Sequence, residues 1–231
     1  MPVYDRRDAT DPRILDHFET GFGWIAHPEE GGQRASYAVR GGDGVWLFDP
    51  LDAAGVDELV AELGEVAGVA VLSNFHARDA DTFADRYDVP VFIPDWMDRV
   101  PERVDASIER YGRELGESGF VVDRIDPLPG WREGVAYREG DGTLYTPDLL
   151  STRWTVGSER LTLTLPCRFF PPRDLLGDLE PNRILVGHGD GIAENATGAL
   201  ADTLDGARQR LPRAVVKQGP ALVAGIAAAF R

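Results

Sequence analysis

The alternation of apolar and polar positions divides the chain into short strand-like and helix-like segments. Apolar runs of about four to eight residues bounded by turn residues are typical of strands, and apolar residues spaced three and four apart are typical of helices. Strands are predicted over residues 23–27, 36–40, 45–49, 68–72, 89–93, 120–125, 134–138, 143–146 and 183–186, and residues 161–165 form an edge strand or a lid. Helices are predicted over 54–66, 79–87, 101–116, 194–211 and 220–230, with a short helix over 12–18 as one alternative for the polar N-terminal segment.

The order of these segments predicts an α/β fold. Strands and helices alternate through the first half of the chain, which favours a parallel or mixed sheet with helices outside. No internal repeat and no linker rich in Gly, Ser or Pro divides the sequence, so residues 1–231 are predicted to form a single domain. Within it we expect an N-terminal arm over residues 1–20 and a helical insertion over residues 95–118.

The charge balance is unusual. The formal net charge is −15, and the 24 Lys+Arg include a single lysine, Lys217, beside 39 Asp+Glu. This balance resembles that of proteins from salt-loving archaea, so we expect a halophilic protein with an acidic surface; an acidic protein from a GC-rich genome is the alternative. A negative surface repels nucleic acid and anionic membranes. The argument against nucleic acid weakens in concentrated salt, where the Debye length falls to about 3 Å.

Cysteine usage and hydropathy predict the compartment. The one cysteine, Cys167, rules out an internal disulfide and fits a reducing cytosol. No apolar run approaches about eighteen residues, and the N-terminus lacks the apolar core of a signal peptide. We therefore expect a soluble, cytoplasmic protein that does not bind membranes.

Candidate chemistry gathers at the ends of predicted strands. The most informative stretch, Ser73 to Asp79, reads Ser-Asn-Phe-His-Ala-Arg-Asp and lies between a strand and a helix. Four further motifs also end strands: Leu47-Phe48-Asp49-Pro50, Leu128-Pro129-Gly130-Trp131, Leu144-Tyr145-Thr146-Pro147-Asp148 and Gly187-His188-Gly189. In this order and spacing they resemble the motifs of the metallo-β-lactamase superfamily over Gly23 to Leu211. The resemblance implies a four-layer αβ/βα sandwich with mixed sheets and a metal site at the strand ends.

The same resemblance implies that most metal ligands have changed. The three histidines that hold one ion in the family correspond here to Asn74, His76 and Trp131. The Asp and two His of the second ion correspond to Arg78, Asp79 and His188, and the bridging Asp corresponds to Asp148. An arginine has no lone pair to donate to a metal. We therefore expect no bound metal; the alternative is one zinc ion held by His76, Asp79, Asp148 and His188, since zinc takes three or four such donors.

The altered residues are still expected to line a cavity. We predict a cavity lined by Asn74, His76, Arg78, Asp79, Trp131, Asp148 and His188. If Arg78 points inward, Asp79 and Asp148 are its expected partners in a bidentate pair; the alternative is that Arg78 points to solvent. Trp131 is expected to pack over the cavity, and Cys167 has no nearby His in sequence to activate it.

These residues lead to two main hypotheses. The first is a degenerate metallo-β-lactamase-like protein without efficient dinuclear hydrolysis, with a binding or regulatory role toward a small molecule or a protein. The alternative is a hydrolase with an altered single-metal site, in which Asp148 or Asp79 orients the attacking water. The family then implies a thioester, a lactone-like ester or a phosphodiester, including RNA ends, as substrate. A nucleic-acid-binding relative that has lost cleavage is a third possibility, which the acidic surface disfavours.

Overall fold

A computed structural model describes residues 3–15 and 17–229 of the chain. Its larger sheet has seven strands in sequence order: β1 (Arg13–Ile14), β2 (Gly21–Ile25), β3 (Ala35–Arg40), β4 (Val45–Phe48), β5 (Val66–Ala70), β6 (Val91–Pro94) and β7 (Ile108–Tyr111). The first four strands pair antiparallel, and β4 to β7 pair parallel. The sheet is therefore mixed, as predicted.

The second sheet has four strands in the order β13 (Arg183–Val186), β10 (Thr143–Thr146), β9 (Trp131–Arg138) and β8 (Val121–Leu128). Strand β10 pairs parallel with β13 and antiparallel with β9. A separate hairpin-like pair is made by β11 (Leu150–Ser151) and β12 (Thr162–Leu163), where the sequence predicted an edge strand or a lid.

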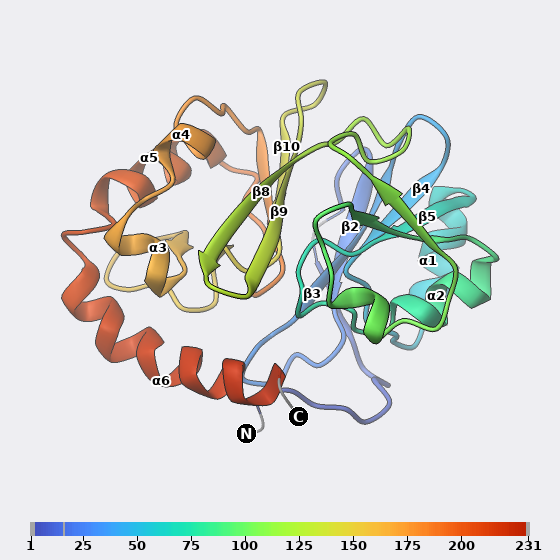
Figure 1. The fold of residues 1–231 in the computed structure, drawn as a ribbon, viewed down its shortest axis with the longest axis horizontal. Coiled ribbons are helices and arrows are strands. Elements are labelled where there is room, and N and C mark those ends of the chain that lie inside the picture. Colours follow the sequence, from blue (N-terminus) through green and yellow to red (C-terminus); the bar gives the residue numbers. More distant parts are fainter. Residues whose placement is uncertain (1–2, 16, 230–231) are drawn as a thin grey trace.

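Helices cover the outer faces of both sheets (Figure 1). The first group is α1 (Val56–Leu63) and α2 (Ala80–Tyr87); the second is α3 (Leu165–Phe169), α4 (Arg173–Leu176) and α5 (Ala196–Gly206). The last helix, α6 (Leu211–Ala229), runs along one end of the molecule toward the N-terminus (Figure 1). None of the helices in the described ranges has the length and apolar character that crossing a bilayer would need.

Three cores lie between the four layers. One joins α1 and α2 to the larger sheet and contains Val60 and Phe83; a second lies between the two sheets and contains Trp46 and Tyr145. The third joins the smaller sheet to α3, α4 and α5. Along β4 the side chains alternate between the first two cores, as the period of a strand requires. The predicted four-layer sandwich is thus confirmed.

The helical insertion predicted over 95–118 is wrong. That segment holds one turn of 3₁₀ helix, Val100–Glu102, and then strand β7, which pairs parallel with β6. Val104 packs in the core beneath α1 and α2, and Tyr111 and Leu115 pack in the core between the two sheets. Since tertiary packing on a free sheet edge outweighs a weak helical pattern, the segment extends the sheet.

Both chain ends also differ from prediction. A helix over 12–18 is not formed, because Arg13 and Ile14 pair with β2; residue 16 lies outside the described residues. The last helix begins at Leu211 rather than Pro220, so Pro220 lies inside it. Pro212 suits a helix start, where its missing N–H costs no hydrogen bond. The predicted end at Phe230 lies outside the described residues.

Candidate metal centre and its cavity

A cavity of about 1160 Å³ opens where the strands of both sheets end. The loops that follow β4, β5, β10 and β13 bring Asp49, His76, Asp148 and His188 to this end of the molecule, as expected for strands that end at one edge of a sheet. The cavity is lined by His76, Arg78, Asp79, Trp131, Asp148 and His188, together with residues 3–10 of the N-terminal arm.

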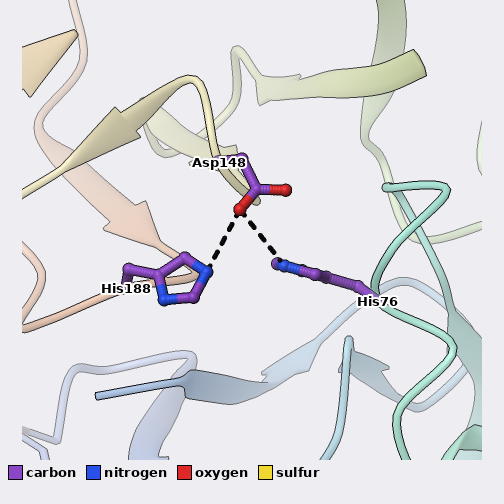
Figure 2. Close-up of side chains that lie close together, drawn as sticks. All are labelled: His76, Asp148 and His188. Carbon is purple, nitrogen blue, oxygen red and sulfur yellow. Dashed lines mark ion pairs between the residues drawn. The ribbon is translucent and has the colours of Figure 1, made fainter. Parts of the chain in front are cut away.

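Two buried histidines and a half-buried aspartate converge in this cavity (Figure 2). The Nε2 atom of His76 lies 3.3 Å from Oδ1 of Asp148, and Nε2 of His188 lies 3.1 Å from the same oxygen. The three potential ligand atoms all lie within 4.8 Å of one another. We call His76, Asp148 and His188 the triad.

The other nitrogen of each imidazole is already bound. Nδ1 of His76 lies 3.0 Å from Oδ2 of Asp49, and Nδ1 of His188 lies 2.9 Å from the carbonyl oxygen of Gly32. A carboxylate and a carbonyl only accept hydrogen bonds, so both Nδ1 atoms carry a hydrogen, and each ring in its neutral form presents an Nε2 lone pair to Asp148. Such outer hydrogen bonds orient metal-binding histidines in proteins.

Burial and charge oppose each other in the triad. Burial and Arg78 lower the pKa of His76, but Asp148 and Asp49 outweigh them and raise it. Burial lowers the pKa of His188 despite its contact with Asp148. Burial would raise the pKa of Asp148, yet the two histidines hold it well below its usual range. The carboxylate therefore stays ionised and needs positive charge beside it.

The loop that carries Asp148 is held by residues that the sequence did not indicate. Ser73 donates its hydroxyl to Oδ2 of Asp148 at 3.0 Å. Oε1 of Glu133 accepts the backbone N–H groups of Asp148 and Leu149 at 2.8 and 2.7 Å. Full burial and then Asp148 raise the pKa of Glu133 well above its usual value. The one signal in the sequence was an acidic residue inside an otherwise buried strand, β9.

Asp49 is a third residue whose role the sequence did not assign. Besides His76, its carboxylate accepts the Tyr145 hydroxyl at 2.5 Å and the backbone N–H of Leu72 at 3.0 Å. Its backbone has φ 44, a left-handed conformation that Asp tolerates better than most residues. Asp49 thus fixes the orientation of His76 from within the two-sheet core.

Arg78 points inward, but its predicted pairing with Asp79 and Asp148 is wrong. Its Nη1 donates to the carbonyl oxygens of Ala35 and Asp49 at 2.6 and 2.7 Å, and Nη2 donates to that of Gly187 at 3.2 Å. These carbonyls belong to the ends of strands in both sheets. Neutral oxygens rather than carboxylates therefore surround the guanidinium, and the carbonyls of Asp49 and Gly187 also accept from the hydroxyl of Ser36 and the N–H of Ala35.

Two other predicted site residues, Asp79 and Asn74, form hydrogen bonds with the backbone of other loops. Oδ2 of Asp79 accepts the backbone N–H of Asp52 at 2.8 Å, so Asp79 lines the cavity but is not part of the triad. Asn74 does not line the cavity, contrary to prediction; its buried side chain donates to the carbonyl of Gly130 at 3.2 Å. Both positions stabilise loops, since a short polar side chain readily bonds to nearby backbone.

Trp131 and Cys167 lie as the sequence suggested. Trp131 is buried, lines the cavity and packs edge-on against Phe75, with ring centroids 5.9 Å apart. Burial raises the pKa of Cys167 to about 12, so its thiol is a poor nucleophile.

The triad fits a zinc ion. Two imidazole nitrogens and one carboxylate oxygen are a common donor set of catalytic zinc, which leaves further positions open for water or substrate. The outer hydrogen bonds from His76 to Asp49 and from His188 to Gly32 aim both Nε2 lone pairs at one point, as such a site requires. Asp79 is not a fourth ligand in this arrangement.

Solved structures with the same architecture support this interpretation of the fold. The metallo-β-lactamase DIM-1, exposed to ceftazidime, matches 88% of this chain and 99% of its own with a TM-score of 0.63 and 12% sequence identity. A metallo-β-lactamase from Pontibacter korlensis matches 86% of this chain and 99% of its own, with a TM-score of 0.59 and 12% identity. The protein TTHA1623 in a di-iron-bound form matches 74% and 94%, with a TM-score of 0.53 and 19% identity.

In sequence, no family model and no curated protein matches the chain. The structural similarity shows that the chain has the metallo-β-lactamase fold, and the predicted fold class is confirmed.

Proposed function

We propose that this chain is a hydrolase of metallo-β-lactamase fold that works with one metal ion, held by His76, Asp148 and His188. The observation that carries the proposal is the convergence of three lone-pair donors whose opposite sides are already hydrogen-bonded. Acceptors that face one another at about 3 Å repel unless a proton or a metal cation lies among them. A divalent ion would supply the charge and act as a Lewis acid toward a carbonyl or phosphoryl oxygen.

A second ion has no comparable place among the described residues. The positions that the family uses for its other ligands hold Asn74, Arg78 and Trp131, and the guanidinium of Arg78 occupies the strand ends beside the triad. A guanidinium there repels a further cation. We therefore infer a single-ion site rather than the dinuclear arrangement.

The chain's own residues have separate roles in hydrolysis. Asp148 orients the attacking water, and its carboxylate is fixed by the hydroxyl of Ser73 at 3.0 Å. Phe75 and Trp131 on one side, with Trp154 beside His188, line the cavity with aromatic surface. These walls suit the apolar part of a small ester, thioester or lactone, and a cavity of about 1160 Å³ accommodates a ligand of that size.

A binding protein without turnover is the second candidate. It is favoured by the contacts that Asp148 makes with both imidazoles, because protonated histidines would satisfy the carboxylate without any metal. In that case the cavity binds a small molecule, and the hydrolytic chemistry of the fold has been lost.

Metal content distinguishes the two candidates. Protein purified untagged, without chelator and in high salt, is analysed for zinc, manganese and iron. The proposal expects one equivalent of metal in the wild type and none in Asp148→Asn or His188→Ala. His27→Ala is the matched control, since His27 lines the same cavity outside the triad.

Hydrolysis of 4-nitrophenyl acetate and of a simple thioester is measured on the same preparations. Metal-dependent turnover that disappears in both triad variants supports the hydrolase. Wild-type protein that carries no metal and takes up none from added zinc contradicts it, and favours the binding protein. Two equivalents of metal would contradict the single-ion site.

A further inference from the structure

The N-terminal arm forms one wall of the metal-site cavity. Residues 3–10 all line it, together with the triad. The arm lies near the C-terminal end of α6 (Figure 1). A polar segment at a chain end stays ordered over the candidate site only where specific contacts hold it.

Backbone hydrogen bonds attach this arm to the loop between β2 and β3. The carbonyl of Val3 accepts the N–H of Gly32 at 2.9 Å, and the N–H of Asp5 donates to Oε2 of Glu30 at 2.8 Å. Arg34 donates from Nη2 to the carbonyl of Asp5 at 2.7 Å. The arm is therefore held at two consecutive points on either side of Tyr4.

The loop that receives the arm is itself fixed by a buried ion pair. Glu30 is only 2% exposed, and Nε and Nη2 of Arg34 each lie 2.8 Å from one of its oxygens. The backbone N–H of Arg34 also donates to Glu30 at 3.0 Å. A two-pronged Arg–carboxylate pair of this kind sets both position and orientation.

These contacts hold the side chain of Tyr4 on the wall of the cavity that the triad also lines. The guanidinium carbon of Arg34 lies 4.9 Å from the centre of the Tyr4 ring. The ring also packs on Gly32, where an added Cβ would lie only 2.8 Å from Cε1 of Tyr4. The carbonyl of this same Gly32 accepts the hydrogen bond from Nδ1 of His188. One glycine thus touches both the arm and a triad ligand.

Electrostatics agree with this placement. Burial, and next the negative charge of Asp148, raise the pKa of Tyr4 to about 12, while Arg34 and Arg78 oppose them. The phenol therefore keeps its hydrogen at neutral pH and is a hydrogen-bond donor on the wall of the cavity.

We propose that Tyr4 is a catalytic residue of this site, donating its phenolic hydrogen to the substrate oxygen on which negative charge develops during hydrolysis. The inference rests on the proposed function and extends it to a residue from the opposite end of the sequence. It fits the proposed substrate class, because esters, thioesters and lactones all develop an oxyanion during hydrolysis. Donors aimed at such an oxygen contribute strongly because they stabilise the transition state more than the ground state.

The test removes the hydroxyl and keeps the ring. Tyr4→Phe retains the contacts with Gly32 and Arg34. Tyr137→Phe is the control, because Tyr137 lies on β9 and lines a different pocket. Its hydroxyl donates to the carbonyl of Glu180 at 3.5 Å. We expect Tyr4→Phe to lower kcat for 4-nitrophenyl acetate about 100-fold with little change in KM. Tyr137→Phe keeps wild-type values, and both variants keep the wild-type metal content and Tm.

A binding measurement accompanies the kinetics. Phenylphosphonate presents a tetrahedral oxyanion, and its Kd is measured by calorimetry on wild type and both variants, with and without zinc. We expect Tyr4→Phe to weaken binding about tenfold, the loss of roughly one hydrogen bond.

The outcomes separate the two proposals. Wild type that binds zinc and hydrolyses the ester, with Tyr4→Phe unchanged in kcat and in phosphonate Kd, overturns the role of Tyr4 and leaves the hydrolase intact. Wild type that takes up no metal overturns the hydrolase, and phosphonate binding to the metal-free protein then decides on Tyr4. Binding that weakens in Tyr4→Phe supports the contact, and binding that is absent or unchanged refutes it.

Discussion

The triad and Arg78 lie side by side at the strand ends, and they meet the same electrostatic need in different ways. At the triad, two imidazole nitrogens and a carboxylate oxygen converge, and the positive charge comes from a bound ion or from a proton taken up by an imidazole. At Arg78, three backbone carbonyls converge on a guanidinium that the chain itself provides. The first arrangement can exchange its cation and the second cannot.

This difference separates chemistry from stability. An exchangeable ion with open positions can polarise a substrate, whereas a guanidinium enclosed by carbonyls holds strands of both sheets together and has no free position to offer. Asp49 connects the two regions, because its carboxylate orients His76 and its carbonyl accepts from Arg78. Variants at these positions should therefore affect different measured quantities.

The largest effect on folding is expected for Arg78→Ala. The change leaves the carbonyls of Ala35, Asp49 and Gly187 without their charged donor. A hydrogen bond to a charged group contributes about 1.5–3 kcal/mol to stability, and the losses of three bonds from one guanidinium overlap. We expect the free energy of unfolding to fall by about 3–4 kcal/mol, with partial recovery in Arg78→Lys, whose single ammonium cannot span all three oxygens. Urea denaturation at fixed salt measures it.

The control for this variant is Arg113→Ala, which removes an exposed pair with Asp123 and should leave the midpoint unchanged. Because Arg78 contacts carbonyls rather than Asp148, adding Asp148→Asn to Arg78→Ala should give no rescue. A clear rescue, or a loss below about 1 kcal/mol, would show that Arg78 serves mainly as a counter-charge to the carboxylate.

A smaller effect, on metal affinity rather than folding, is expected for Asp49→Asn. The backbone at Asp49 has φ 44, which Asn also tolerates, and the carbonyl that Arg78 uses is kept. The amide is a weaker acceptor for Nδ1 of His76, so zinc affinity should fall about 10–100-fold. Competition with a chelator of known affinity measures this change.

Asp52→Asn is the matched control, since Asp52 lines the same cavity but does not contact the triad. Equal zinc affinity in Asp49→Asn and the wild type would mean that Asp49 does not position His76. In that case the two regions would be independent of each other.

The sequence predicted most of the fold because its strongest signals are local. Helix α2, with Phe83 and Ala84 on its buried face, and strand β4, with alternating buried faces, are each specified by their own periodicity. The segment before β7 has no such clear period, and the free edge of β6 decides its conformation. Elements that depend on a distant partner are therefore the ones that pattern alone assigns wrongly.

The site divides in the same way. His76, Asp148 and His188 stand in motifs, so they were found from the sequence, whereas Asp79 and Asn74 stand in the same motifs and bond to nearby backbone instead. Two of the groups that orient the triad carry no motif signal. Glu133 acts on Asp148 from β9, and Gly32 acts on His188 from 156 positions away. Their roles arise from how the two sheets pack, which periodicity does not reveal.

The smallest expected effect is that of salt on the stability lost in Arg78→Ala. It distinguishes the contacts of Arg78 from those of the exposed carboxylates. With a net charge of −15, the wild type should gain thermal stability between about 0.1 and 2 M KCl, because screening reduces repulsion among exposed carboxylates. The acceptors of Arg78 are neutral carbonyls in close contact, so the loss of stability in Arg78→Ala should be the same at both salt concentrations. Melting curves of both proteins at the two concentrations provide the comparison.

A flat wild-type curve would remove the halophilic interpretation. A loss that shrinks in high salt would instead place Arg78 among the charges that screening reaches, and its difference from the triad would then be one of degree.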